Sequence, residues 1–387
     1  MSIERVNGFI EKSIFLENRV EVTDSIETWD NLSELYNVPI EEIGLIDFNR
    51  SGICLPNNEV IENFRVRFKG DIMYRDGLSS WYALPVRNAL DTNFYSADGS
   101  LYFKDNIVGS VEELMLDTCE SSYKRGPNLL NLNSRSRSNC GGCRACVHNY
   151  KNLYDETVIH DGKQLLTKED LERFFDIENS AEINVSKLDQ IAVVTGLFGS
   201  EGAVVDHMKL VSEVAGQRGF KGELMYFGCE VNSELALDEL SKLGNFSLVY
   251  AIDNFTKRDK ILAKSKSLIT IDDAKQTLDL AKERGMSTTF AYIAGIDSIM
   301  DMKEGFIKLK KSITKFPIIN VYQVQTAGQV KIMDEDARKL EYYIQARKVI
   351  EDVMFDTKLR PRRWENYRPL WYKSFNKELL ENKPYGN

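Results

Sequence analysis

Residues 191–227 read IAVVTGLFGSEGAVVDHMKLVSEVAGQRGFKGELMYF. The segment begins with a short apolar run, continues into an amphipathic stretch at 204–218 that stops at Gly219, and ends with a second apolar run. Short runs rich in β-branched and aromatic residues are typical of buried strands, and a glycine just past an amphipathic stretch is typical of a helix end. The sequence therefore predicts a strand–helix–strand unit here.

The same alternation recurs through more than half of the chain. Apolar runs of strand length occupy residues 129–132, 191–195, 223–227, 247–252, 288–294 and 318–324. Helical stretches lie between most of them, and two of these begin with capping boxes, TKED at 167–170 and TIDD at 270–273. Strand–helix alternation predicts a parallel sheet with helices outside. Six such units are too few for a closed barrel, which leaves a partial (β/α)6 TIM-like barrel or a doubly wound sheet. In either fold the active site lies at the carboxyl ends of the strands. We predict the partial barrel.

We expect three regions along the chain. They are an N-terminal accessory α+β domain at 1–126, the partial barrel at 127–335, and a C-terminal helix with a basic and aromatic tail at 336–387. The Gly126-Pro127 pair marks the first boundary. The tail segment 358–373, KLRPRRWENYRPLWYK, could bind phosphate or stack on bases, or it could close the side or bottom of the barrel. We favour closure, because its two prolines suit an extended clamp and the rest of the chain is acidic.

The composition restricts the class of protein. The 387 residues have a formal charge of −9, with 43% hydrophobic and 28% charged residues. These values are normal for a soluble globular protein, and the acidic balance argues against general binding of nucleic acid. The first twenty residues mix charged with apolar side chains, unlike a signal peptide, and no apolar run approaches the roughly 20 residues that span a bilayer. We therefore expect a cytoplasmic protein, in which clustered cysteines bind metal or act in catalysis.

Three of the six cysteines fall within seven residues, in the segment SRSRSNCGGCRACVHNY at 134–150, directly after the first predicted strand. They are Cys140, Cys143 and Cys146. A structural zinc site needs four ligands, and Cys119 or His148 could supply the fourth. A ferredoxin-type 4Fe–4S cluster also takes four thiolates. A cluster held by three cysteines leaves one iron open, as catalysis requires.

With this triplet after the first strand and five further strand–helix units, residues 127–335 resemble the radical S-adenosylmethionine (SAM) superfamily. The resemblance implies that the three cysteines hold a 4Fe–4S cluster and that SAM completes the fourth iron. In that family the reduced cluster cleaves SAM to methionine and a 5′-deoxyadenosyl radical, which abstracts a hydrogen atom from the substrate. The spacing here is C-x2-C-x2-C, whereas the usual family spacing is C-x3-C-x2-C. Ala145 stands where the family often has an aromatic residue, so His148 or Tyr150 would replace it.

The resemblance also implies SAM-contacting roles for residues at later strand ends. They are Gly196, Gly199 and Glu201 for the methionine amino group, Asp253 for the ribose, Lys266 or Lys264 for the carboxylate, and Ile293 and Gly295 for the adenine. The family's acid after the fifth strand is matched by Asp297, which sits one position early. Cys229, after the third strand, could donate a hydrogen atom to a product radical. A lone cysteine is more often a small buried hydrophobic residue, and we favour that interpretation.

The sequence thus predicts a radical SAM enzyme that uses a 4Fe–4S cluster and SAM. The chemistry implies an external reductant of the flavodoxin or ferredoxin type. The substrate, a small molecule or a peptide, is not identified. The alternative is a non-catalytic zinc-binding interaction protein, engaging nucleic acid through its basic tail.

Overall fold

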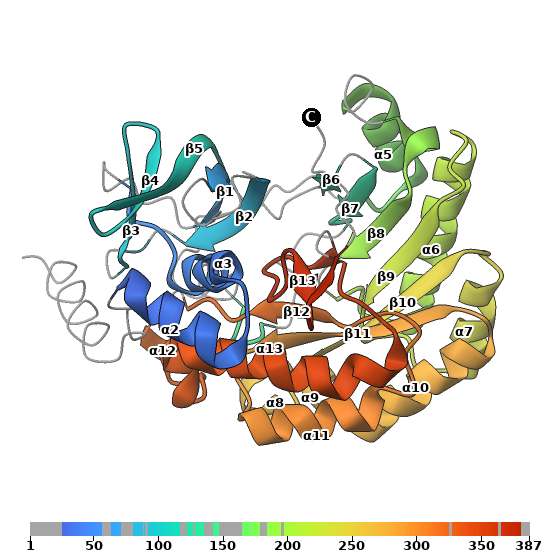
Figure 1. The fold of residues 1–387 in the computed structure, drawn as a ribbon. Coiled ribbons are helices and arrows are strands. Elements are labelled where there is room, and N and C mark those ends of the chain that lie inside the picture. The colour runs from blue at the N-terminus through green and yellow to red at the C-terminus, as the bar shows by residue number, and fades with distance from the viewer. Residues whose placement is uncertain are drawn as a thin grey trace, which may run out of the picture.

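The computed structural model places two large sheets and a set of helices around them (Figure 1). It describes residues 25–55, 63–70, 80–87, 89, 92–116, 122–126, 128–134, 142–146, 165–178, 184–194, 197–324, 327–362 and 365–380. Within that part of the chain, none of the helices has the length and apolar character that crossing a membrane requires.

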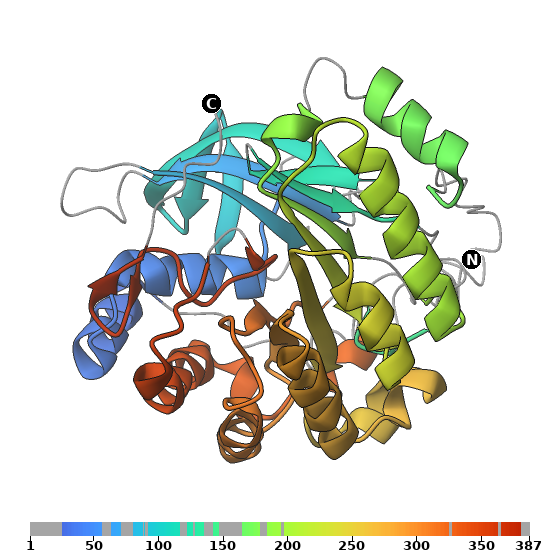
Figure 2. The ribbon, with the colours of Figure 1, turned by 90° about the vertical axis from the view of Figure 1, so that its right-hand side faces the viewer.

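The larger sheet is a curled, mostly parallel half-barrel. Its strands are β6 (Ser122–Gly126), β7 (Leu129–Leu132), β8 (Gln190–Val194), β9 (Glu223–Gly228), β10 (Phe246–Asp253), β11 (Ser287–Ala294) and β12 (Ile318–Val321). They lie side by side in chain order, with β7 to β12 parallel and β6 antiparallel to β7. A doubly wound sheet reverses its strand order and carries helices on both faces. Here the order never reverses, and the helices cover the outer face of the curl (Figure 2). The predicted partial (β/α)6 barrel is confirmed.

Helices follow most of the strands, as the sequence predicts. The longer ones are α6 (Glu201–Gly216), α7 (Glu234–Ser241), α10 (Ile271–Glu283), α11 (Ile299–Leu309) and α13 (Leu340–Met354), and the shorter ones are α5 (Lys168–Arg173), α8 (Arg258–Ile261), α9 (Lys264–Ser267) and α12 (Ala327–Val330). Both capping boxes are present, at Thr167 and at Thr270. For the last long helix the sequence predicts residues 334–355, but α13 begins only at Leu340. The backbone N–H of Asp334 instead donates to Gly295 O, which ties this segment to the end of β11.

Alternate residues of each strand face opposite sides of the sheet. In β10, Phe246 and Leu248 pack against residues of α6 and α7 on the outer side. Val249 instead belongs to a small inner cluster of buried apolar residues contributed by five adjacent strands. The cluster consists of Ala192, Met225, Val249, Ala291 and Ile318. This cluster identifies the inner wall of the half-barrel.

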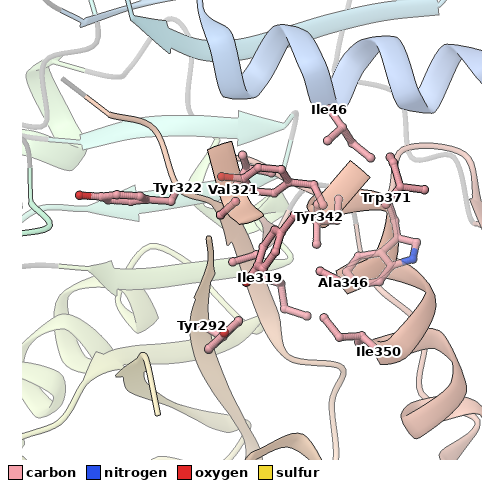
Figure 3. Close-up of a cluster of buried hydrophobic side chains, with 14 of the residues drawn as sticks. Ile46, Tyr292, Ile319, Val321, Tyr322, Tyr342, Ala346, Ile350 and Trp371 are labelled. Atoms are coloured by element: carbon pink, nitrogen blue, oxygen red, sulfur yellow. The ribbon is translucent and has the colours of Figure 1, made fainter. Parts of the chain in front are cut away.

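The N-terminal region packs on the barrel through shared apolar core. It contains α2 (Ile26–Tyr36), α3 (Ile40–Ser51) and an antiparallel sheet of β1 (Asn63–Gly70), β2 (Ser80–Arg87), β3 (Phe94–Ala97), β4 (Ser100–Phe103) and β5 (Asn106–Leu116). Ile46 of α3, Ile350 of α13 and Trp371 of the tail lie in one buried cluster (Figure 3). The region is mixed α and β, as expected, and it shares that core with the barrel helix.

A fully buried charge cluster joins three distant parts of the chain. The guanidinium of Arg347 in α13 donates to Glu42 of α3 at 2.5 Å and to Glu351 at 3.0 Å. Glu42 also accepts the backbone N–H groups of Tyr372 and Ser374 from the tail, at 2.8 and 2.9 Å. Because buried charges are tolerated only when paired and hydrogen bonded, this cluster holds the N-terminal helix, the last helix and the tail together.

The C-terminal tail covers the free edge of β12. The backbone N–H of Val321 donates to Arg368 O at 2.8 Å, and that of Ile319 donates to the side-chain oxygen of Asn366 at 2.7 Å. Trp371 and Tyr372 are buried. An uncovered edge strand exposes unpaired backbone groups, which the tail satisfies here. The favoured interpretation of the tail, closure of the barrel side, is confirmed.

Candidate active site at the mouth of the half-barrel

The described part of the cysteine loop, residues 142–146, lies at the carboxyl end of the sheet. Of the triplet, the structure describes Cys143 and Cys146; Cys140 falls outside the described residues. Cys143 Sγ accepts the backbone N–H of Ala263 at 3.3 Å, and Arg144 N donates to Ile261 O at 2.7 Å. Both partners belong to the segment that follows β10. The loop is therefore docked at the edge of the sheet where the sequence places the active site.

The two described cysteines are half-buried and lie within one tight turn. Cys146 N donates to Cys143 O at 2.9 Å, and Gly142 just before the turn has a φ of 74°, which a side chain would strain. Among the described residues, no three His, Cys, Asp or Glu side chains form a metal-binding group. The third cysteine of the triplet lies outside that set, so the ligation of a cluster by all three stays a prediction.

Lys266 and Asp253 form an ion pair close to this loop. Asp253 is the last residue of β10 and has a φ of 63°, which turns the chain out of the strand. The side chains of Lys266 and Asp253 are 15% and 16% exposed. Burial opposes the charge of Lys266, but the carboxylate of Asp253 and the nearby sulfurs of Cys229 and Cys143 outweigh it and raise the pKa of the ammonium. The structure thus brings together two residues that the sequence places apart, beside the sulfur of Cys143.

Cys229 follows β9 and faces the same ion pair. Its side chain is buried within the apolar core that includes Tyr250 and Ile252. Burial raises the pKa of the Cys229 thiol, and the nearby Asp253 and Glu230 carboxylates act in the same direction while Lys266 acts against them. A neutral, buried thiol is compatible with both interpretations of this residue, and its role stays a prediction.

The glycine-rich segment after β8 is tied to the loop after β9. Glu201 accepts the backbone N–H groups of Asn232 and Ser233 at 2.5 and 2.6 Å, and the Ser233 hydroxyl at 2.6 Å. Burial would raise the pKa of Glu201, but the bonds from Ser233 and Asn232 lower it. Glu201 therefore holds the start of α7 with both carboxylate oxygens.

Backbone N–H groups of the same segment also have hydrogen-bond partners. The N–H of Gly199 donates to Glu230 at 2.8 Å, as does that of Phe198. Gly196 lies outside the described residues. In this arrangement the segment does not present Gly199 N or Glu201 to the Lys266–Asp253 pair. A role for these residues toward SAM stays a prediction.

At the end of β11 the chain packs against α13 and is held by hydrogen bonds to Asp297. Ile293 is half-buried and shares the inner side of its strand with Ala291, whereas Gly295 lies against the last helix. Gly295 has a φ of 120°, and a Cβ there would come within 2.7 Å of the Tyr343 hydroxyl. Asp297 is buried and accepts the backbone N–H groups of Phe255 and Thr256 at 2.7 and 3.1 Å. Gly295 and Asp297 thus maintain the backbone around the strand end.

Sequence reasoning missed a set of polar residues on β7 and just after it. Asn131, Asn133 and Ser134 are at most 2% exposed, and each has a side-chain oxygen or nitrogen without a hydrogen-bond partner. The signal was available in the alternation Leu130-Asn131-Leu132-Asn133, because a polar residue at every second position of a buried strand requires an explanation.

No family model and no curated protein matches this chain. Solved structures that resemble it include a radical SAM methyltransferase, TsrM, from Kitasatospora setae with cobalamin and a [4Fe-4S] cluster bound, at 13% identity and a TM-score of 0.32. They also include coproporphyrinogen III oxidase (HemN) from Escherichia coli, described as a radical SAM enzyme, at 15% identity and a TM-score of 0.31. The matches cover 47% and 49% of this chain, and 34% and 46% of the other two. The order and register of the chain's own strands form the half-barrel.

Proposed function

We propose that this chain is a radical SAM enzyme whose cluster site is the cysteine loop at the mouth of the half-barrel. The observation that supports this most is the position of Cys143, docked on the segment after β10 beside Lys266 and Asp253. Three thiols near the strand ends of an open parallel barrel would place a metal centre next to the enclosed face of the sheet. A structural zinc site only holds the fold together and does not have to lie beside the strand ends of a barrel.

The residues present suit an iron–sulfur cluster. Cys143 and Cys146 each offer a sulfur of the kind that ligates iron, and Cys143 Sγ already accepts a backbone N–H bond, of the kind that tunes the potential of cluster sulfurs. The ammonium of Lys266 complements the negative charge of thiolate ligands. Cys140, Cys143 and Cys146 would together hold a 4Fe–4S cluster with one iron left for SAM.

When bound, the cluster would supply the electron that cleaves SAM to methionine and a 5′-deoxyadenosyl radical. The chain's own residues have simpler tasks. Lys266 would pair with a carboxylate of the bound molecule, Asp253 would accept a hydroxyl hydrogen bond, and the apolar inner wall would exclude water. The electron would come from a flavodoxin or ferredoxin type reductant, and the substrate would be a small molecule or a peptide.

Metal analysis of anaerobically purified protein tests the proposal. We expect a brown protein with about four irons and four sulfides per chain. Incubation with SAM and dithionite should release 5′-deoxyadenosine. Cys143→Ala should lose both the colour and the product, whereas Cys54→Ala, at a half-buried free cysteine of the N-terminal region, should retain both. A colourless protein with one zinc per chain would overturn the proposal in favour of the zinc-binding alternative.

A further inference from the structure

The side chains of Asn131 and Asn133 lie on the inner side of the half-barrel. Leu130 and Leu132, which alternate with them, belong to the outer core under the helices. Asn131 pairs in register with Ala192 of β8, a member of the inner apolar cluster. Asn133 follows on the same side, one step nearer the carboxyl end where the cysteine loop lies.

The side chains of these residues are buried without partners. Asn133 is 2% exposed, and neither its amide nitrogen nor its amide oxygen has a hydrogen bond. The amide oxygen of Asn131 and the hydroxyl of Ser134 also have no hydrogen-bond partner. An unsatisfied buried polar group costs about 1–3 kcal/mol, and native proteins hold few of them. Four such atoms within four residues require a hydrogen-bonding partner that the described part of the chain does not supply, and a bound ligand is such a partner.

The chemistry of these atoms selects the kind of group they would bind. Asn133 offers one donor and one acceptor side by side, and both are free, so the choice of which atom is nitrogen does not affect the inference. Asn131 adds an acceptor, and Ser134 adds a hydroxyl that can do either. None of the three is charged. A carboxylate or an ammonium would remain without a countercharge, whereas a neutral amide satisfies a donor and an acceptor together.

The other residues of the inner wall indicate that the rest of the ligand is apolar. The neighbouring inner residues Ala192, Met225 and Val249 are apolar. The Lys266–Asp253 pair lies beyond β10, three strands away from β7 in the sheet. The strands that carry the polar atoms and the ion pair are therefore not neighbours in the sheet.

We propose that Asn133, with Asn131 and Ser134, forms a recognition site for a neutral amide of the substrate, a carboxamide or peptide group attached to an apolar body. This deepens the proposed function by naming a substrate class. The site itself requires no cluster.

The test uses N-acetyl-L-leucinamide as the probe and the full-length, anaerobically purified protein. Saturation-transfer NMR or calorimetry should detect binding of the probe, and binding should weaken by about tenfold or more in Asn133→Leu. N-acetyl-L-leucine, which keeps the acetyl amide but has a carboxylate in place of the carboxamide, should bind less well than N-acetyl-L-leucinamide. Asn245→Leu, at an exposed asparagine outside the half-barrel wall, is the matched control and should bind the probe like the parent protein.

Stability gives a second readout that is independent of binding. Because Asn133 makes no hydrogen bond, Asn133→Leu should unfold at the same temperature as the parent or higher. A purely structural asparagine would instead lower the unfolding temperature. Asn131→Leu is a second variant, and it should also bind the probe more weakly than the parent protein.

Three results would overturn the inference: no binding of the amide by the parent protein, equal binding by Asn133→Leu, or a clear loss of stability in Asn133→Leu. These outcomes are distinct from failure of the proposed function. A colourless zinc protein that still binds the amide through Asn133 would leave the recognition site standing and remove the radical chemistry.

Discussion

Asp253 ends β10 in a left-handed backbone conformation, and its carboxylate pairs with the ammonium of Lys266, thirteen residues further on. The pair lies next to the sulfurs of Cys143 and Cys229, which contribute to the raised pKa of Lys266. A strand end, a short helix and the cysteine loop are therefore linked through one partly buried charge pair.

Lys266→Met should lower the free energy of unfolding by about 1–3 kcal/mol, because it leaves the carboxylate of Asp253 partly buried without its partner. Lys264→Met, at an exposed lysine of the same short helix, should have almost no effect. Adding Asp253→Asn to Lys266→Met should recover much of the loss, since asparagine tolerates a positive φ and carries no charge. Urea unfolding of the single and double variants measures this coupling. Additive losses would show that the two side chains do not interact.

His207 should make the protein less stable as the pH falls from about 6.5 to about 4. Burial lowers the pKa of His207 to about 4, and neither ring nitrogen has a partner. Between those pH values the unfolded chain binds a proton that the folded chain excludes, so stability is lost as the pH decreases. The loss should approach about 3 kcal/mol. His207→Leu should remove this part of the pH dependence, as measured by thermal unfolding at pH 7 and at pH 4.5. Identical pH slopes in the parent and the variant would contradict the prediction.

Arg347→Met should be among the most damaging substitutions outside the barrel mouth. It would leave Glu42 and Glu351 buried without the guanidinium that compensates them, at a cost of about 3–5 kcal/mol. Lys348→Met, on the same helix, removes a partly exposed partner of Glu351 and should cost less than about 1 kcal/mol. The difference between the two midpoints of denaturation checks the prediction. Similar midpoints would mean that the buried cluster does not bind the tail and α3 to the barrel.

Gly295→Ala should destabilise the fold by more than about 1 kcal/mol. Alanine is strained at a φ of 120°, and its Cβ would meet the Tyr343 hydroxyl at 2.7 Å. Gly202→Ala, in α6, meets nothing within 4 Å and should be neutral or stabilising. If the contact with the hydroxyl matters, Tyr343→Phe should relieve part of the loss in the Gly295→Ala background, as seen in the unfolding temperature.

Much of the barrel was predictable because its signals are local. The six apolar runs form the six parallel strands, and both threonine capping boxes start helices, since each depends on residues a few positions apart. The start of α13 was predicted too early. The backbone N–H of Asp334 donates to Gly295 O, so the residues of the first expected turn do not form an α-helix. A local sequence pattern contains no information about such a distant contact.

For the site, the residue types were foreseeable but their partners were not. Glu201 stands in a glycine-rich turn of the expected kind, yet its carboxylate holds Ser233, and Gly199 donates to Glu230. Which acid meets which N–H depends on how neighbouring strand ends are placed, and composition does not contain that information.

The sequence by itself determined the alternation of strands and helices, the helix caps and the concentration of thiols in one loop, because short-range periodicity and hydrogen bonding act between residues close in the chain. Only the tertiary structure decided that Cys143 meets Ala263, 120 residues away, and that Arg347 meets Glu42, 305 residues away. It also decided that Asn133 is buried without a partner. Charge pairing and desolvation act through space, so their outcome exists only once the sheet has curled and brought the distant segments together.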